Sequence, residues 1–362
     1  SLIVSAIIST LLVPATLLIT AEKALAAPGT FYCTSYGDYP ILVNDNGSGA
    51  YHVKKLTVPN GSAPSSASLT GSQATLDISN INALGISPVD DKAYGIVSGS
   101  KLVRFDDDEV RYVANVEEAA TQGTFDVHGD YIYGDGSDIY RVRRPDQLTG
   151  YSSSSDSNIV DGHDSGVNSG VHSGAVSIVG GSAGQVADWA AIRADLGGGD
   201  GVQNYLVGLD GPAEKVRVVK YQTHSGVANA DTSSGWALTT LTPSTDFANN
   251  KPWRNAWYWQ GRLLFQHKNG DVYEVGTTAG SNLTGSEATV TDLGNADNIK
   301  DGDGMNCFDS PGFTVAESGG GTSVNEQGTS TDTFTVVLDS KPAGNVVIGV
   351  SSGDTGEATV SA

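Results

Sequence analysis

Short apolar strands alternate with polar turns between residues 82 and 275, and the strands recur in pairs. In each pair the first strand opens on a small or polar residue, and the second ends on an aromatic or apolar pair. The pairs are 82–86 with 102–105, 123–127 with 139–142, 188–192 with 216–219, and 255–259 with 272–275. The first two pairs begin 41 residues apart. A repeat of this length is typical of blades, so the pattern predicts a β-propeller.

The segment before the first repeat resembles a blade without its first strand. Residues 41–43, 50–53 and 74–78 have strand-like patterns, and Asn-Gly and Gly-Ser turns separate them. A propeller usually closes its ring with a blade built from both ends of the chain, because this leaves no exposed sheet edge. We expect residues 288–293 and 298–306 to supply the missing strands. This arrangement predicts five blades, with six as the nearest alternative.

Composition supports an all-β fold and limits the partners. The chain has 46 glycines and 14 tyrosines, and Ser and Thr are abundant. Residues 150–186 are rich in Ser and Gly, which predicts a long loop between blades. The formal net charge of −21 argues against binding to nucleic acid or to anionic membrane surfaces, because both require a basic face.

The pattern changes after Pro311. Strand-length segments at 313–318, 333–338 and 346–350 alternate apolar residues with Thr or Ser, and Gly, Asp and Pro turns divide them. This pattern is typical of a β-sandwich, and about 50 residues amount to roughly half of one. The expected fold is therefore an all-β chain, a propeller over residues 27–310 followed by a partial immunoglobulin-like sandwich over 311–362.

The first residues have the features of an export signal. Residues 2–19 are mostly apolar, and Ala24-Leu25-Ala26 forms a cleavage sequence of the A-x-A type. This predicts a signal peptide over residues 1–26 that lacks its true start, while a membrane anchor is the alternative. In an exported protein the two cysteines, Cys33 and Cys307, favour a disulfide that encloses the propeller, and free thiols are the alternative.

Motifs for chemistry are sparse. The segment 180–184, Gly-Gly-Ser-Ala-Gly, matches a nucleophile elbow, but its flanks show no helix. His163, Asp164 and His172 fit no standard zinc spacing. The acidic runs 106–109 and 297–303 place hard oxygen ligands on turns, where either calcium or water can surround them. No carboxylate pair for glycoside hydrolysis can be selected among 41 acidic residues.

Aromatic residues gather in one segment, where Trp253, Trp257, Tyr258 and Trp259 lie near two arginines. Exposed Trp beside Arg would suit a sugar or peptide ligand. Alternation along a strand would instead bury Trp257 and Trp259 between blades, which is the interpretation we favour.

Two family resemblances rest on these segments. Residues 313–362, with Ser323-Val324-Asn325-Glu326 and Ser351-Ser352-Gly353-Asp354, resemble the opening half of the Calx-beta-like repeats of bacterial surface proteins and adhesins. That resemblance implies an immunoglobulin-like sandwich displayed outside the cell. It also implies calcium held by acidic loops, with Glu326 and Asp354 as candidate ligands, and we add Asp301 and Asp303 from the propeller as further candidates.

Residues 33–307 resemble a family of secreted, functionally uncharacterised propeller-like domains. The similarity is carried by residues 82–90, 93–96, 102–105 and 298–307. It implies the propeller fold and export, and it implies no activity or ligand.

Together these features predict a non-enzymatic exported cell-surface protein, with a propeller head on a β-sandwich stalk. Its role would be adhesion or recognition of an extracellular glycan or protein ligand, with calcium as the candidate cofactor. One alternative is a secreted polysaccharide-degrading hydrolase or lyase that uses the propeller channel, in which acidic and aromatic residues should converge on one face. The other is a structural component of a surface layer.

Overall fold

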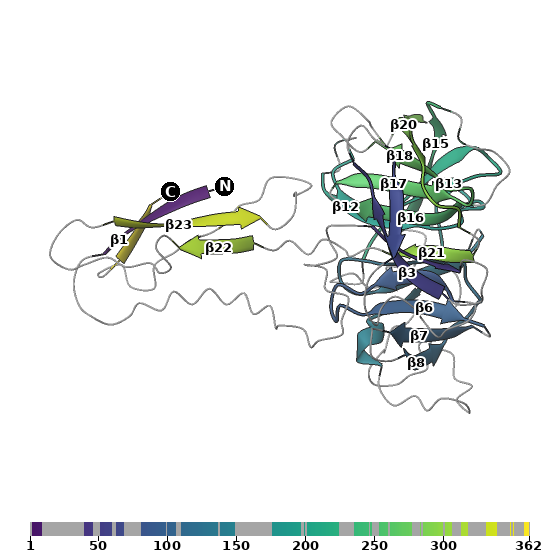
Figure 1. Cartoon of the computed structure of the whole chain (residues 1–362), viewed down its shortest axis with the longest axis horizontal. Coiled ribbons are helices and arrows are strands. Elements are labelled where there is room, and N and C mark those ends of the chain that lie inside the picture. Colours follow the sequence, from purple (N-terminus) through teal and green to yellow (C-terminus); the bar gives the residue numbers. More distant parts are fainter. Residues whose placement is uncertain are drawn as a thin grey trace. The chain divides into compact units, whose positions relative to one another are not determined.

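The structure is a computed structural model. It describes residues 2–8, 40–45, 51–59, 63–68, 81–98, 100–105, 110–136, 138–148, 176–196, 199, 201–223, 235–245, 247, 253–259, 261–276, 283, 285–299, 301–305, 313–317, 331–338, 348, 350 and 358–361. The chain divides into two compact units: Ala26–Asp309 is one, and Ser1–Leu25 with Ser310–Ala362 is the other (Figure 1). Among the described residues, no helix is long and apolar enough to cross a membrane.

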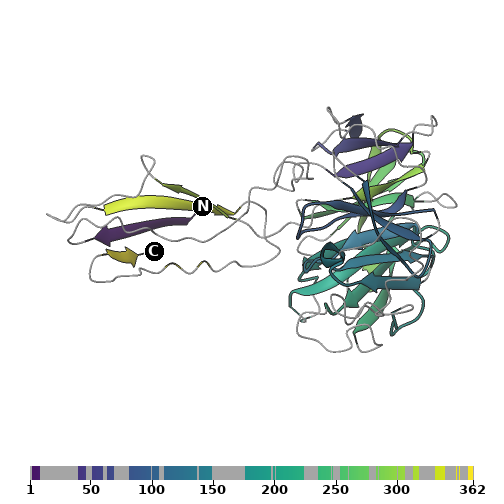
Figure 2. The same cartoon turned by 90° about the horizontal axis from the view of Figure 1, so that it is seen from below.

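The larger unit is a β-propeller of five sheets, and we number these blades 1 to 5 (Figures 1 and 2). Blade 1 contains β21 (Asp301–Met305), β2 (Ile41–Asp45), β3 (Tyr51–Thr57) and β4 (Ser65–Ser68). Blade 2 contains β5 (Asn82–Ile86), β6 (Ala93–Val97), β7 (Lys101–Phe105) and β8 (Val110–Asn115). Blade 3 contains β9 (Gln122–Phe125), β10 (Tyr131–Asp135) and β11 (Asp138–Val142).

Blades 4 and 5 follow in the chain. Blade 4 contains β12 (Ala190–Ala194), β13 (Gln203–Asp210), β14 (Lys215–Tyr221) and β15 (Trp236–Pro243), and the short β19 (Glu287–Ala288) pairs in parallel with β15. Blade 5 contains β16 (Trp253–Trp259), β17 (Arg262–His267), β18 (Asp271–Val275) and β20 (Val290–Asn295). Neighbours within each blade otherwise pair antiparallel, and the prediction of five blades is confirmed.

The ring closes with a strand from the far end of the domain, as expected. β21 pairs antiparallel with β2 across the Ile41↔Met305 to Asp45↔Asp301 register, and so supplies the first strand of blade 1. The assignment of residues 288–293 to the same blade was wrong. β20 pairs with β18 and completes blade 5, whose outer edge would otherwise leave backbone groups unpaired. The expected strand at 74–78 lies outside the described residues.

The core is divided among the five seams between blades. One cluster of buried apolar residues lies at each seam, and the cluster between blades 2 and 3, for example, joins Tyr94 and Leu102 to Phe125 and Tyr131. Because the inner strands are covered by neighbouring blades on both faces, apolar runs rather than strict alternation mark strands such as β5, β6, β9 and β10. Residues 150–175 of the predicted long loop lie outside the described residues, and Val176 bonds through its N–H to the carbonyl of Ile139 in blade 3.

The smaller unit contains a single sheet in its described part. Its strand order is β22 (Phe313–Glu317), β23 (Thr331–Leu338), β1 (Leu2–Ile8) and β24 (Ala358–Ser361). Phe334 and Val336 form its buried centre. The strands expected at 313–318 and 333–338 are present, but the described residues show no second sheet and thus no separate sandwich. The apolar run that we interpret as a signal peptide contributes β1 here, between β23 and β24.

Candidate functional site

The best candidate site lies on the propeller axis, where the innermost strands of the five blades meet. The strands β21, β5, β9, β12 and β16 contact one another in a closed ring. Each of these strands has a polar residue within it or, for β12, two residues before it. The set is Asn82, Gln122, Asp188, Asn255 and Asp303. All of these except Asn82 are buried. The ring therefore brings five polar groups from distant parts of the sequence into the centre of the domain.

Two of these groups are carboxylates in direct contact. The side chains of Asp188 and Asp303 form a hydrogen bond to each other, although their strands belong to blades 4 and 1. Burial raises the pKa of Asp188 well above its usual range, and the neighbouring Asp303 raises it further. The pKa of Asp303 is also raised well above its usual range, because the carboxyl group is buried. Two carboxylates this close cannot both ionise easily, so the pair keeps a shared proton to a higher pH than an isolated carboxyl group would.

Backbone N–H groups donate hydrogen bonds to the carboxyl oxygens of both aspartates. Asp188 accepts hydrogen bonds from the N–H of Trp189 at 2.8 Å and from the N–H of Ala256 in blade 5 at 2.6 Å. Asp303 accepts from the N–H of Leu84 in blade 2 at 2.7 Å and from its neighbour Gly304 at 2.8 Å. Each carboxyl group thus links its own blade to the next innermost strand.

Other polar groups complete the axial cluster. The indole Nε1 of Trp189 donates to Oε1 of Gln122 at 2.8 Å, which joins blade 4 to blade 3. Asn255 donates from Nδ2 to Oε1 of Gln266 at 2.9 Å within blade 5. The hydroxyl of Tyr131 donates to the carbonyl of Ala83. Burial raises the pKa of Tyr131, and Asp303 contributes to this shift.

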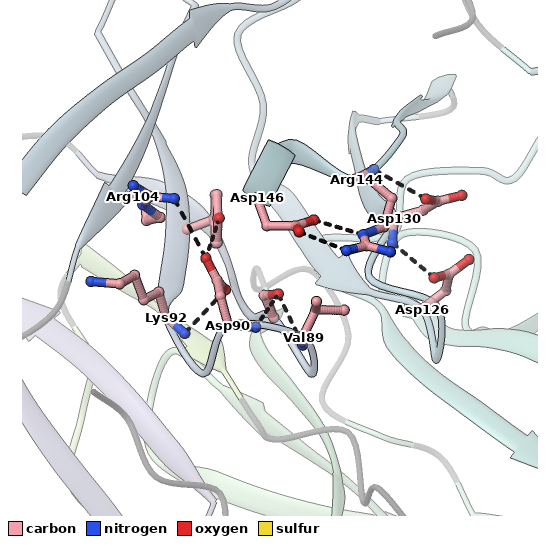
Figure 3. A network of polar contacts seen from close by, with 10 residues as sticks. Val89, Asp90, Lys92, Arg104, Asp126, Asp130, Arg144 and Asp146 are labelled. Atoms are coloured by element: carbon pink, nitrogen blue, oxygen red, sulfur yellow. Dashed lines mark hydrogen bonds and ion pairs between the residues drawn. The ribbon is translucent and has the colours of Figure 1, made fainter. Parts of the chain in front are cut away.

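A second polar network lies where the first two strands of blades 2 and 3 turn (Figure 3). In blade 3, Asp126 Oδ1 accepts from the N–H groups of His128 and Asp130, both at 2.9 Å, and this fixes the turn. Arg144 donates through its backbone N–H to Asp130, and its guanidinium forms two hydrogen bonds of 2.7 Å with Asp146 (Figure 3). These side chains order the turns.

The residues proposed as metal ligands are placed as follows. Asp303 is fully buried and its oxygens accept backbone N–H bonds, so donors occupy the positions a cation would need. The backbone of Asp301 begins β21, while Glu326, Asp354, the run 106–109, and His163, Asp164 and His172 lie outside the described residues. The part of the chain that the structure describes contains no group of three or more His, Cys, Asp or Glu that could hold a metal. Calcium binding stays a prediction, as does the Cys33–Cys307 disulfide, whose two residues are also outside the described part.

The serine motif lacks the context of a nucleophile elbow. Residues 176–189 contain turns and two isolated bridges and no helix. The hydroxyl oxygen of Ser182 accepts a bond from the N–H of Gly184 at 3.2 Å in an exposed turn. The motif therefore reflects the abundance of Gly and Ser.

The aromatic segment is mostly packed inside. Trp257 is fully buried in the seam between blades 5 and 1, and its Nε1 donates to the carbonyl of Ile41 at 2.7 Å. Trp259 is partly buried against the same cluster, and Trp189 is buried in the seam between blades 3 and 4. The preference for burial over an exposed Trp–Arg surface is confirmed for Trp257.

Comparisons with known proteins identify no family for this chain. No protein-family profile matches the chain, and no curated protein matches it. Solved structures similar to it include YCF48 bound to D1 peptide, at 10% identity and a TM-score of 0.29, covering 67% of each chain. YCF48 from Cyanidioschyzon merolae has 10% identity and a TM-score of 0.31, over 80% of this chain and 77% of that one. Hsv2 from Kluyveromyces lactis has 9% identity and a TM-score of 0.30, over 83% and 91%.

The strand topology by itself establishes the β-propeller. The two family resemblances drawn from the sequence stay predictions. Sequence reasoning missed the Asp188–Asp303 pair, although the opening polar position of each repeat was a signal for the ring to which Asp188 belongs.

Proposed function

We propose that this chain is a non-enzymatic, exported recognition protein whose propeller serves as a rigid binding head. The smaller unit would belong to a stalk of repeats at the cell surface. The ligand would be an extracellular glycan or protein. The acidic composition supports a role away from nucleic acids and anionic lipid, because a net charge of −21 repels both.

One observation carries the proposal: the carboxylates that converge on the axis accept backbone hydrogen bonds that join neighbouring blades. Asp188 and Asp303 are 3% and 0% exposed, and each bonds to a backbone N–H of another blade. A general acid or base must instead come within hydrogen-bond reach of the substrate. Bonds of this kind between blades make the propeller a stable scaffold. In such scaffolds the connecting loops usually carry the residues that bind ligands.

The test is a binding experiment with the purified chain. It would be applied to arrays of extracellular glycans and to whole cells, with calcium and with a chelator, while the supernatant is analysed for cleaved polysaccharide. We expect saturable binding without cleavage. Assembly of the protein on itself, with no binding to foreign ligands, would favour the structural surface-layer alternative and contradict the proposal.

The hydrolase or lyase alternative is kept because two acids and Tyr131 do meet on the axis. Asp188→Asn removes one ionisable group from the axis and keeps one oxygen that can accept a backbone N–H bond. Cleavage of a polysaccharide by the wild type that is lost in this variant, with the fold intact, would favour the enzyme. Binding retained by the variant, without cleavage in either protein, would support recognition.

A further inference from the structure

A separate buried polar cluster lies in the seam between blades 3 and 4. Its centre is Arg141 on β11, which is 1% exposed. The guanidinium carbon lies 4.8 Å from the ring centre of Trp236 and 5.7 Å from that of Tyr221, and these two rings stack on each other. Arg141 Nη2 donates to the carbonyl of Gln222 at 2.8 Å. The guanidinium group of Arg141 in blade 3 therefore contacts two aromatic rings of blade 4 and a backbone carbonyl just after β14.

Two aspartates of blade 3 lie beside this arginine. Asp130 Oδ2 is 3.7 Å from Arg141 Nη1. Asp126 is fully buried, and it raises the pKa of the Tyr221 hydroxyl, as burial does more strongly. Asp126 Oδ1 also accepts the N–H of Asp130 at 2.9 Å, so the Asp126 carboxyl group lies next to the residue that pairs with Arg141.

Several polar atoms of this cluster are buried without a hydrogen-bond partner among the described residues. They are Asp126 Oδ2, Asp130 Oδ2, the Tyr221 hydroxyl and Trp236 Nε1. Buried polar atoms in proteins nearly always find a partner, either in the protein or in ordered water. The set is mixed, because a carboxylate oxygen needs a donor, an indole N–H needs an acceptor, and a phenol can be either.

We propose that this seam is a binding site for ordered water, which bridges Asp126 Oδ2 of blade 3 to the Tyr221 hydroxyl of blade 4. Asp130 Oδ2 and Trp236 Nε1 are its further partners. Water suits the set because it donates and accepts at once, and internal waters typically make about three hydrogen bonds. A metal cation fits poorly beside the Arg141 guanidinium, and an anion fits poorly beside two carboxylates.

A crystal structure of the chain at about 1.3 Å resolution tests the site directly. We expect a fully occupied water within hydrogen-bond distance of Asp126 Oδ2 and the Tyr221 hydroxyl. Direct contact between these two groups, a bond to another part of the chain, or a peak with metal-like distances and anomalous signal would each overturn the proposal.

A pair of matched variants gives a second readout that needs no crystals. The Tyr94 hydroxyl donates directly to Asp90 at 2.8 Å, so Tyr94→Phe removes a known hydrogen bond. If a water molecule hydrogen-bonds to the Tyr221 hydroxyl, Tyr221→Phe should lower the urea midpoint by about as much as Tyr94→Phe does. A midpoint that stays unchanged or rises in Tyr221→Phe would mean that the hydroxyl has no partner, and the proposal would be wrong.

Discussion

Asp126 shows how one buried carboxyl group makes stability depend on pH. Burial, and then the neighbouring Asp130, raise its pKa to about 7, while Arg141 opposes the shift. An unfolded chain releases this proton near pH 4. The folded state therefore binds more protons than the unfolded state between these values, and stability falls as pH rises from about 4 to 7.

Asp126→Asn should remove this contribution. The amide oxygen can still accept the N–H bonds of His128 and Asp130 that fix the turn. We expect the urea midpoint of the variant to fall less than that of the wild type between pH 4.5 and pH 8. Part of the slope should remain, because Asp188 and Asp303 also have raised pKa values. The exposed Asp292→Asn is the control, and equal slopes in all three proteins would refute the assignment to Asp126.

Paired charges repeat between blades, once with the signs exchanged. Arg104 lies 3.6 Å from Asp90 in blade 2, and Arg141 lies 3.7 Å from Asp130 in blade 3. Both arginines are the third residue of the second strand in their repeat pair, at 102–105 and 139–142. In blade 5 the corresponding residue of 272–275 is Glu274. Glu274 pairs with Arg262 at 2.7 Å. In blades 2, 3 and 5 this position therefore holds a paired charge of either sign, whereas blade 4 has the buried Val218 there.

Exchanging the two charges of blade 5 tests this conclusion. Arg262→Glu alone would place two carboxylates together, and Glu274→Arg alone would place two guanidinium groups together. Both side chains are about a quarter exposed, so we expect each single change to cost about 1 kcal/mol in the free energy of unfolding. The double variant should recover most of that loss in urea unfolding. Additive losses would show that the pair has no coupling.

At the scale of the strand, small residues allow the five innermost strands to converge. A Cβ atom at Gly123 of β9 would lie 2.0 Å from the carbonyl oxygen of Ala83 in β5. The neighbour is backbone, which cannot rotate away as a side chain can. The spacing between blades 2 and 3 thus depends on this glycine.

Gly123→Ala should therefore destabilise the propeller by about 3 kcal/mol, the upper range for overpacking, measured by urea unfolding. Gly136→Asn is the matched control. Gly136 has φ of 62° and open space around its Cβ position, and Asn tolerates that conformation. A loss in Gly123→Ala no larger than that of the control would contradict the close approach of β9 and β5.

The repeat pattern predicted the strands better than it predicted their partners. The pairs at 82–86 and 102–105 correspond to β5 and β7, because apolar runs between polar turns report local burial. The pattern at 288–293 also marked a strand, but it could not say that β18 rather than β2 lies beside it. The contact between Asp188 and Asp303 was hidden for the same reason, since it arises only when the ring closes.

For the whole molecule, closure depends on β21, the strand that joins the end of the domain to its beginning. Its pairing with β2 completes blade 1. Asp303 extends this link in two further directions, to the N–H of Leu84 in blade 2 and to the Asp188 carboxyl group in blade 4. One side chain on the closing strand therefore ties together three of the five blades.

Asp303→Ala should loosen the closed ring. It leaves the buried N–H of Leu84 without its acceptor, and an unpaired buried donor costs about 1 to 3 kcal/mol. We expect a lower urea midpoint and faster proteolysis near residues 301–305. Asp292→Ala removes an exposed carboxylate whose hydrogen bond among the described residues is local, from the N–H of Gly294, and it should change neither measurement. Equal behaviour of the two variants would mean that β21 is held by its pairing with β2 alone, and that the axial carboxylates contribute nothing to closure.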